Sequence, residues 1–102
     1  MSAYVIMFRD STHDPEGLKT YAELALRAPS AKIELVASSK LGRHRVLEGD
    51  TIEAAVILRF PEWEDALEWY ESPEYQAARK HRLASGTFRA VLIEGMPAGA
   101  GE

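Results

Sequence analysis

The sequence predicts a single α+β domain in which four strands form one antiparallel sheet with helices on one face. Segments typical of strands and helices follow one another in the order β-α-β, β-α-β. The chain has 102 residues, 46% of them hydrophobic, which suits one domain and is too short for two. A chain of this size buries only about two-thirds of its unfolded surface, so a partner subunit would enlarge its core.

The first two elements are a strand and a helix. Residues 3–8 are continuously apolar and rich in β-forming residues, which predicts a strand. Asp14 and Pro15 mark a helix start, because aspartate suits the capping position and proline the first helical position. Pro29 ends that helix. Its apolar residues recur at helical spacing and form a stripe that we expect to face the sheet: Leu18, Tyr21, Ala22 and Ala25.

Two more strands follow, with a polar loop between them. The second strand, residues 33–37, places its three odd-numbered apolar residues on one face. Residues 38–50 are polar and contain two glycines, which predicts a long loop or hairpin arm. Residues 52–60 are again apolar and predict the third strand.

The segment of residues 60–82 holds both tryptophans and two of the four tyrosines. At about 100° per residue, its first half forms an amphipathic helix with an aromatic arc and an opposite acidic arc. Acidic residues also gather near the start of this helix, where the dipole favours negative charge. Core packing is the favoured interpretation of the aromatic arc, because buried aromatic side chains mostly serve the core. The arc comprises Trp63, Ala66, Leu67, Trp69 and Tyr70.

A Ser-Pro pair interrupts this helix and starts another. Ser72 suits the capping position, and Pro73 suits the first helical position. In the new helix Tyr75, Ala78 and Arg82 lie on nearly one line, because seven residues make close to two turns. We therefore expect Arg82 to point toward the interior of the protein or its edge.

An arginine at that position needs an anionic partner or an exit to solvent. Two interpretations are open. Arg82 pairs internally, with Glu94, Glu48 or the helix C-terminus, or it binds an anionic ligand. The internal pair is the favoured interpretation, because structural ion pairs outnumber ligand sites. The basic residues beside it are expected at the helix C-terminus, facing water: Arg79, Lys80 and His81.

Residues 87–93 predict the fourth strand, and residues 96–102 predict a flexible tail behind a domain of residues 1–95. Right-handed crossovers in this order of elements produce the split βαβ, ferredoxin-like arrangement, with both helices on one face of the sheet. The first, third and fourth strands are apolar on both sides, and no chain remains to cover the second face. A homodimer that pairs through this open sheet face is therefore expected.

Residues 69–75 form a Trp-Tyr-x-Ser-Pro-x-Tyr motif, which is the most specific part of a resemblance that covers nearly the whole chain in order. This resemblance is to an uncharacterised family, the domain of unknown function thirteen-thirty, in the dimeric α/β-barrel superfamily. It implies a ferredoxin-like monomer that pairs as a dimeric α/β barrel, and it implies no established reaction. The other matching positions are Glu48-Gly49, Phe60-Pro61, Ala66, Arg82 and Glu94-Gly95.

Composition excludes several classes of site and partner. The net charge of -4 disfavours nucleic acid as a partner, and the lack of cysteine removes disulfides, thiol catalysis and cysteine-based metal sites. The sequence has no signal peptide pattern and no apolar run of about 20 residues, so a cytoplasmic protein without a membrane partner is expected. No cofactor and no metal site are expected. His13 lies between Asp10 and Asp14, and a solvated loop with a helix cap is the favoured interpretation of this cluster.

Three functions stay open. The first is a dimer that binds a small organic molecule, with or without an anionic group, between the sheet and the helices. The second is a cofactor-independent enzyme, resembling the oxygenases and isomerases of the wider superfamily, with His13 moving a proton and Arg82 stabilising an enolate or carboxylate. The third is a purely structural or interaction dimer. The predicted ligand-binding residues are Tyr4, Tyr21, Trp69, Tyr70, Ser72, Tyr75 and Arg82.

Overall fold

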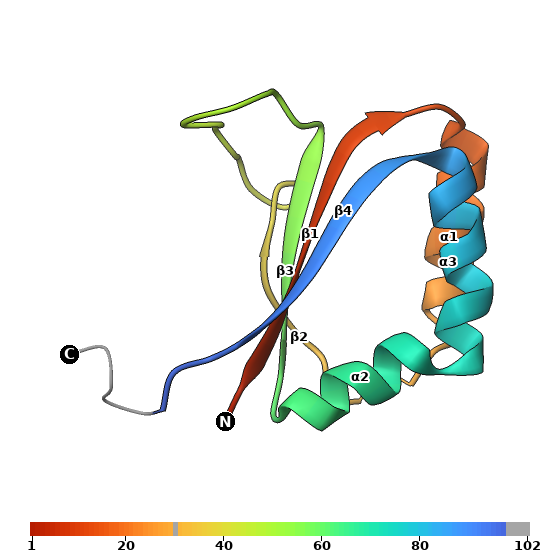
Figure 1. Cartoon of the computed structure of the whole chain (residues 1–102). Coiled ribbons are helices and arrows are strands. Elements are labelled where there is room, and N and C mark those ends of the chain that lie inside the picture. Colours follow the sequence, from red (N-terminus) through yellow and green to blue (C-terminus); the bar gives the residue numbers. More distant parts are fainter. Residues whose placement is uncertain (30, 98–102) are drawn as a thin grey trace.

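A computed structural model describes residues 1–29 and 31–97 of the protein (Figure 1). The described residues form four strands and three helices. In chain order these are β1 (Ala3–Thr12), α1 (Pro15–Ala25), β2 (Glu34–Ser38), β3 (Ala54–Phe60), α2 (Trp63–Glu71), α3 (Pro73–Ser85) and β4 (Gly86–Glu94).

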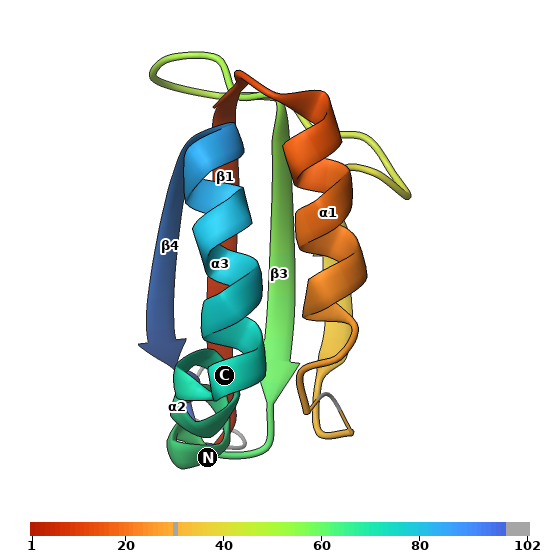
Figure 2. The same cartoon turned by 90° about the vertical axis from the view of Figure 1, so that its right-hand side faces the viewer.

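The four strands make one antiparallel sheet in the order β2-β3-β1-β4. Both long helices, α1 and α3, lie side by side on one face of this sheet, and α2 lies across its lower end in the view of Figure 2. This order of strands with helices on one face is the ferredoxin-like arrangement, so the predicted fold class is confirmed.

Alternation along β1 decides which side chains face the helices. Ala3, Val5 and Met7 are buried under the helix layer. Their neighbours across β3 are Phe60, Leu58 and Val56, in that order. Residues at alternate positions in a strand point to opposite faces, so Tyr4, Ile6 and Phe8 lie on the open face. The same alternation holds in β4. There Phe88, Ala90 and Leu92 pair with the helix-facing residues of β1.

The predicted break between the second and third helices is confirmed. Ser72 caps α3, where its hydroxyl accepts a hydrogen bond from the Tyr75 amide at 3.2 Å. The same hydroxyl donates to the carbonyl of Trp69 at 2.8 Å, at the end of α2. One buried side chain therefore ends one helix and starts the next, and Pro73 lies in the first turn where its missing N–H has no cost.

The core lies at the α2 end of the molecule and is built on a cluster of aromatic rings. Trp69 is the centre of this cluster, with its ring centroid 4.2 Å from that of Tyr75 and 5.4 Å from that of Phe60. Tyr75 and Phe60 are almost completely buried. The predicted packing role of the aromatic arc is therefore confirmed for Trp69, while Trp63 and Tyr70 pack partly buried against the core.

Several predicted boundaries differ from the structure. The first helix ends at Ala25, before the predicted limit at Pro29, and Ala22 of its apolar stripe is exposed. In β2 a register shift between Leu35 and Ala37 breaks the expected alternation. The strand lies at the sheet edge, where a bulge is easily accommodated.

Two further differences concern the ends of elements. α3 runs to Ser85, so Arg79, Lys80 and His81 lie in its middle and not at its C-terminus. β1 continues to Thr12, past the predicted end at residue 8, because its last residues pair with the first residues of β4. The predicted tail of residues 96–102 extends outside the described residues; Met96 and Pro97 belong to no helix or strand.

The second face of the sheet carries no helix among the described residues (Figure 1). Its side chains are apolar, and Val91 and Ile93 remain 53% and 52% exposed. Charged pairs flank this apolar surface. Arg89 donates two hydrogen bonds to Asp10, at 2.8 and 3.0 Å, and the Arg89 hydrogen bond lowers the pKa of the Asp10 carboxyl. An apolar centre with a charged margin is typical of a surface that contacts another chain.

Candidate functional site

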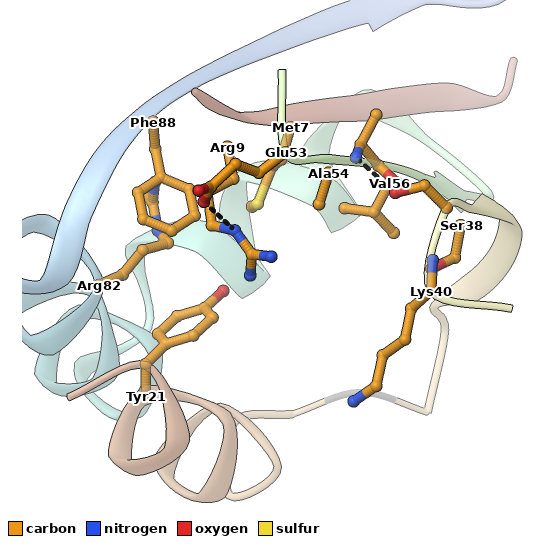
Figure 3. A pocket seen from close by; sticks show the side chains of 12 residues that line it. Met7, Arg9, Tyr21, Ser38, Lys40, Glu53, Ala54, Val56, Arg82 and Phe88 are labelled. Carbon is orange, nitrogen blue, oxygen red and sulfur yellow. Dashed lines mark hydrogen bonds and ion pairs between the residues drawn. The ribbon is translucent and has the colours of Figure 1, made fainter. Parts of the chain in front are cut away.

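A cavity of about 580 Å³ lies between the sheet and the helices, at the opposite end from the aromatic core (Figure 3). Every strand and both long helices contribute to its wall. The volume falls in the range of small-molecule sites, about 300–1,000 Å³. A wider hollow of about 920 Å³ shares part of this lining and extends along α1. The lining comprises Met7, Arg9, Tyr21, Ser38, Ser39, Lys40, Glu53, Ala54, Ala55, Val56, Arg82 and Phe88.

Arg82 is the most buried charged residue of this wall. Only 3% of its surface is exposed, and its buried Nε has no hydrogen-bond partner within residues 1–29 and 31–97. Its guanidinium carbon lies 5.1 Å from the centre of the Phe88 ring and 5.9 Å from that of Tyr21. None of the ion pairs among the described residues involves Arg82, so neither Glu94 nor Glu48 pairs with it there.

The second arginine of the cavity, Arg9, has a carboxylate beside it. Its Nε lies 3.3 Å from Oε1 of Glu53. Glu53 also accepts a hydrogen bond from the Thr12 hydroxyl at 2.5 Å. Figure 3 shows the Arg9 guanidinium and the Tyr21 hydroxyl pointing into the same part of the cavity. The positive charge of Arg9 is therefore largely offset within the protein, whereas that of Arg82 is not.

A pair of tyrosine hydroxyls links the core to the cavity. The Tyr21 and Tyr75 oxygens lie 2.9 Å apart, and Tyr75 is fully buried. If Tyr21 donated this hydrogen bond, the Tyr75 proton would be left in the core without an acceptor, at about 1–3 kcal/mol. We therefore assign Tyr75 as the donor, which leaves the Tyr21 proton free to face the cavity.

Tyr21 stays protonated under ordinary conditions. Burial, and then the adjacent Tyr75 hydroxyl, raise the pKa of Tyr21 well above its usual value. A neutral phenol beside an arginine is a hydrogen-bond donor that an anionic oxygen can accept from. The site thus offers two kinds of donor to an anion: the buried guanidinium of Arg82 and the hydroxyl of Tyr21.

The structure brings together only part of the predicted ligand-binding set. Arg82 and Tyr21 line the cavity, and Tyr75 contacts it through Tyr21. Trp69 and Ser72 lie in the core and at the helix junction, away from the cavity wall. They hold the end of α3 that carries Tyr75 and therefore support the site from behind.

The remaining predicted residues lie elsewhere. Tyr70 accepts a hydrogen bond from Arg79 at 2.8 Å and lines a separate apolar hollow of about 260 Å³ beneath α2. Tyr4 lies on the open face of the sheet, opposite the cavity. His13 is exposed, and its Nε2 lies 3.2 Å from the Thr87 hydroxyl, outside the cavity lining. Arg82 thus lines the cavity and His13 does not, so the structure does not bring these two side chains together at one centre.

Sequence reasoning missed Arg9, Glu53 and Phe88 as site residues. The sequence pattern could have identified Arg9. It continues the alternation of Ala3, Val5 and Met7, which places a charged side chain on the helix-facing side of the sheet. Phe88 had the same alternation on the last strand. Glu53 had no signal, because it reaches Arg9 from a loop of irregular structure.

Among the described residues, no group of three or more histidine or acidic side chains could hold a metal ion. No helix in residues 1–29 and 31–97 has the length and apolar character to cross a membrane.

A family model for the domain of unknown function (DUF1330) matches residues 2–96. The chain belongs to this family. The predicted resemblance is therefore confirmed, and the DUF1330 match spans every described strand and helix. No curated protein matches the sequence of this DUF1330 chain.

Solved structures share the fold of this DUF1330 protein at low sequence identity. A protein of unknown function from Rhodopseudomonas palustris has a TM-score of 0.65 at 18% identity, covering 94% of this chain and 83% of its own. A dimeric ferredoxin-like protein of unknown function from Thermobifida fusca has a TM-score of 0.60 at 14% identity, with 93% and 92% covered. SnoaB, a cofactor-independent oxygenase from Streptomyces nogalater, has a TM-score of 0.54 at 13% identity, with 97% and 96% covered. These similarities establish the fold alone.

Proposed function

We propose that this DUF1330 protein is a homodimer in which each subunit binds a small organic anion in the cavity between sheet and helices. The observation that carries the proposal is Arg82. A guanidinium this buried is costly without a counter-charge, and its Nε has no hydrogen-bond partner in the part of the chain that the structure describes. A bound anion would supply both the charge and the acceptor.

The rest of the wall suits the apolar part of such a molecule. Phe88 and Tyr21 present aromatic rings, and Met7 and Val56 present aliphatic surface from the sheet. Pockets of this kind combine a mostly apolar lining with a few placed polar groups. The Tyr21 hydroxyl and the Arg82 guanidinium are the polar groups here, so the expected ligand has an apolar body and an anionic group.

The dimer is supported by the open face of the sheet. Val91 and Ile93 on β4 are half exposed, and the central residues of β1 on this face are apolar. A second copy of the chain, packed sheet against sheet, would cover both surfaces at once. Ferredoxin-like neighbours described as dimeric share the fold, which is consistent with this arrangement.

The enzyme alternative has less support. SnoaB is a cofactor-independent oxygenase with the same fold, but fold alone does not carry a reaction. His13, the suggested general base, lies outside the cavity lining. A purely structural role would be favoured by an internally paired Arg82 and by the absence of a cavity. Arg82 has no ion-pair partner among the described residues, and a cavity lies beside it.

Two dyes of nearly the same shape test the proposed binding. Anilinonaphthalene sulfonate carries one negative charge, and N-phenylnaphthylamine lacks the sulfonate. Loss of a hydrogen bond to a charged group costs about 1.5–3 kcal/mol, so we expect Arg82→Met to weaken the anionic dye about tenfold to a hundredfold. Binding of the neutral dye should change little. Fluorescence titration of both dyes gives the two dissociation constants.

Lys80→Met is the matched control, because it removes a positive charge from the exposed face of the same helix. We expect it to leave both dyes unaffected. Arg82→Met should also unfold at the same temperature as the wild type or higher, since it removes an unpaired buried charge. Equal weakening of both dyes, or anionic binding that ignores Arg82, would contradict the proposal.

A further inference from the structure

We infer that the cavity selects ligands with one negative charge over ligands with two, and that Glu53 is the residue that sets this preference. The inference rests on the proposed function, since it concerns the same cavity. It assigns a role to a carboxylate that the binding argument above does not use. It also narrows the ligand to a monoanion, such as a monocarboxylate with an aromatic or aliphatic body.

Glu53 is held in place by three contacts to one strand. Its backbone amide donates to the Arg9 carbonyl at 2.8 Å. Its Oε1 accepts from the Thr12 hydroxyl at 2.5 Å and lies 3.3 Å from Nε of Arg9. The carboxylate is therefore fixed against β1 at the cavity wall, although it belongs to the loop that precedes β3. Figure 3 shows the Glu53 carboxylate joined to the Arg9 side chain by a dashed line at the cavity wall.

The charges of the lining side chains favour a ligand with a single negative group. The described lining has three cationic side chains, Arg9, Lys40 and Arg82, and one carboxylate, Glu53. Glu53 offsets Arg9 directly. Lys40 is exposed, so water screens its charge. Arg82 alone is a buried cation without a paired carboxylate among the described residues, and one anionic group balances it.

A second anionic group on the same ligand would meet a different environment. The only other partly buried cation of the described lining is Arg9, and its charge is already paired with the Glu53 carboxylate. To reach Arg9, the second group must approach the Glu53 carboxylate or displace it from the Thr12 hydroxyl. Like charges at close range disfavour binding, and a displaced carboxylate loses its hydrogen bond. Glu53 thus occupies the place that a second ligand carboxylate would take.

Glu53→Gln tests this role, because the amide keeps the shape and can still accept from Thr12. Glu48→Gln is the matched control: it removes one negative charge from the same exposed loop, outside the lining. The probes are benzoate and terephthalate, which share a ring and differ by one carboxylate. Each is measured near neutral pH by its displacement of anilinonaphthalene sulfonate from the wild type and from both variants.

We expect the wild type and Glu48→Gln to bind benzoate more tightly than terephthalate. In Glu53→Gln the ratio of the two dissociation constants should shift toward terephthalate by about fivefold to tenfold, a size that allows for the partial exposure of Glu53. An unchanged ratio in Glu53→Gln, or an equal shift in Glu48→Gln, overturns the inference. Displacement that does not depend on Arg82 overturns the proposed function instead, so the two failures are distinguishable.

Discussion

At the scale of single residues, the feature on which the proposed function rests is a buried arginine between two aromatic rings. The Phe88 and Tyr21 rings lie within 6 Å of the Arg82 guanidinium carbon, at 5.1 and 5.9 Å. Ring faces attract a cation, and this attraction grows when water is excluded. The rings therefore make the buried charge tolerable without neutralising it, which keeps the guanidinium available to an anion.

Tyr21 leads to a prediction about alkaline pH. Its pKa is raised in the folded protein, chiefly by burial, whereas an unfolded tyrosine ionises near pH 10. Below about pH 10 both states hold the proton, and above it only the unfolded state releases it. The free energy of unfolding should therefore fall by about 1.4 kcal/mol per pH unit from this residue alone.

The measurement compares the wild type with Tyr21→Phe in urea unfolding between neutral pH and about pH 11. The difference between their free energies of unfolding should be constant below about pH 10 and should then shrink as the wild type loses stability. Phenylalanine cannot ionise, so the variant isolates this one group. Parallel curves for the two proteins across the whole range would contradict the raised pKa.

At the scale of elements, the junction between α3 and β4 positions the cavity. Arg82 lies in the last turn of α3, and Phe88 is the third residue of β4. Gly86 joins them and is buried against β1. A Cβ on Gly86 would lie 2.4 Å from the carbonyl oxygen of Ser11. The tight approach of these two strands thus depends on the absence of a side chain.

We expect Gly86→Ala to lower the free energy of unfolding by about 1–3 kcal/mol, because the clash is with backbone that cannot rotate away. Gly42→Ala is the control, since its Cβ would meet only the Ser38 carbonyl, at an ordinary 3.6 Å. Urea unfolding of the two variants and the wild type gives the difference. A Gly86→Ala protein as stable as Gly42→Ala would show that the strands can separate without loss.

Most elements could be predicted from local pattern, and the differences arise where tertiary contacts decide. Ser72 and Pro73 fixed the break between α2 and α3, because capping chemistry is local. The length of β1 could not be read from its own residues, since Ser11 and Thr12 are polar and become strand only by pairing with β4. The same holds for the cavity. Arg82 could be predicted because helical spacing places it on the same side of its helix as Tyr75. Glu53 could not, because it contacts Arg9 from a loop 44 positions away in the sequence.

At the scale of the whole molecule, the space between sheet and helices is filled at one end and hollow at the other. The rings of Phe60, Trp69 and Tyr75 pack the α2 end. The cavity at the far end is lined by apolar side chains from the sheet together with a few charged and hydroxyl side chains. The aromatic core and the proposed binding site therefore lie at different ends of one layer, so we expect variants at Arg82 or Glu53 to change ligand binding without unfolding the core.

The open face of the sheet gives the last prediction, which tests the proposed dimer. Val91 lies on this face in β4, an edge strand of the sheet, is 53% exposed in one subunit, and points away from the cavity. A second subunit would bury it, and a glutamate there would place an unpaired charge in an apolar interface. We expect Val91→Glu to weaken dimerisation at least tenfold, as measured by sedimentation over a range of protein concentrations.

Leu26→Glu is the control for this substitution, because Leu26 is 83% exposed at the end of α1, on the helix side of the molecule. It should leave the dimer intact. The cavity lies on the other face of the sheet from Val91, so monomeric Val91→Glu should still bind anilinonaphthalene sulfonate in a manner that depends on Arg82. A wild type that is monomeric at micromolar concentration would contradict the dimer while leaving the proposed binding site untouched, because Val91 does not line the cavity.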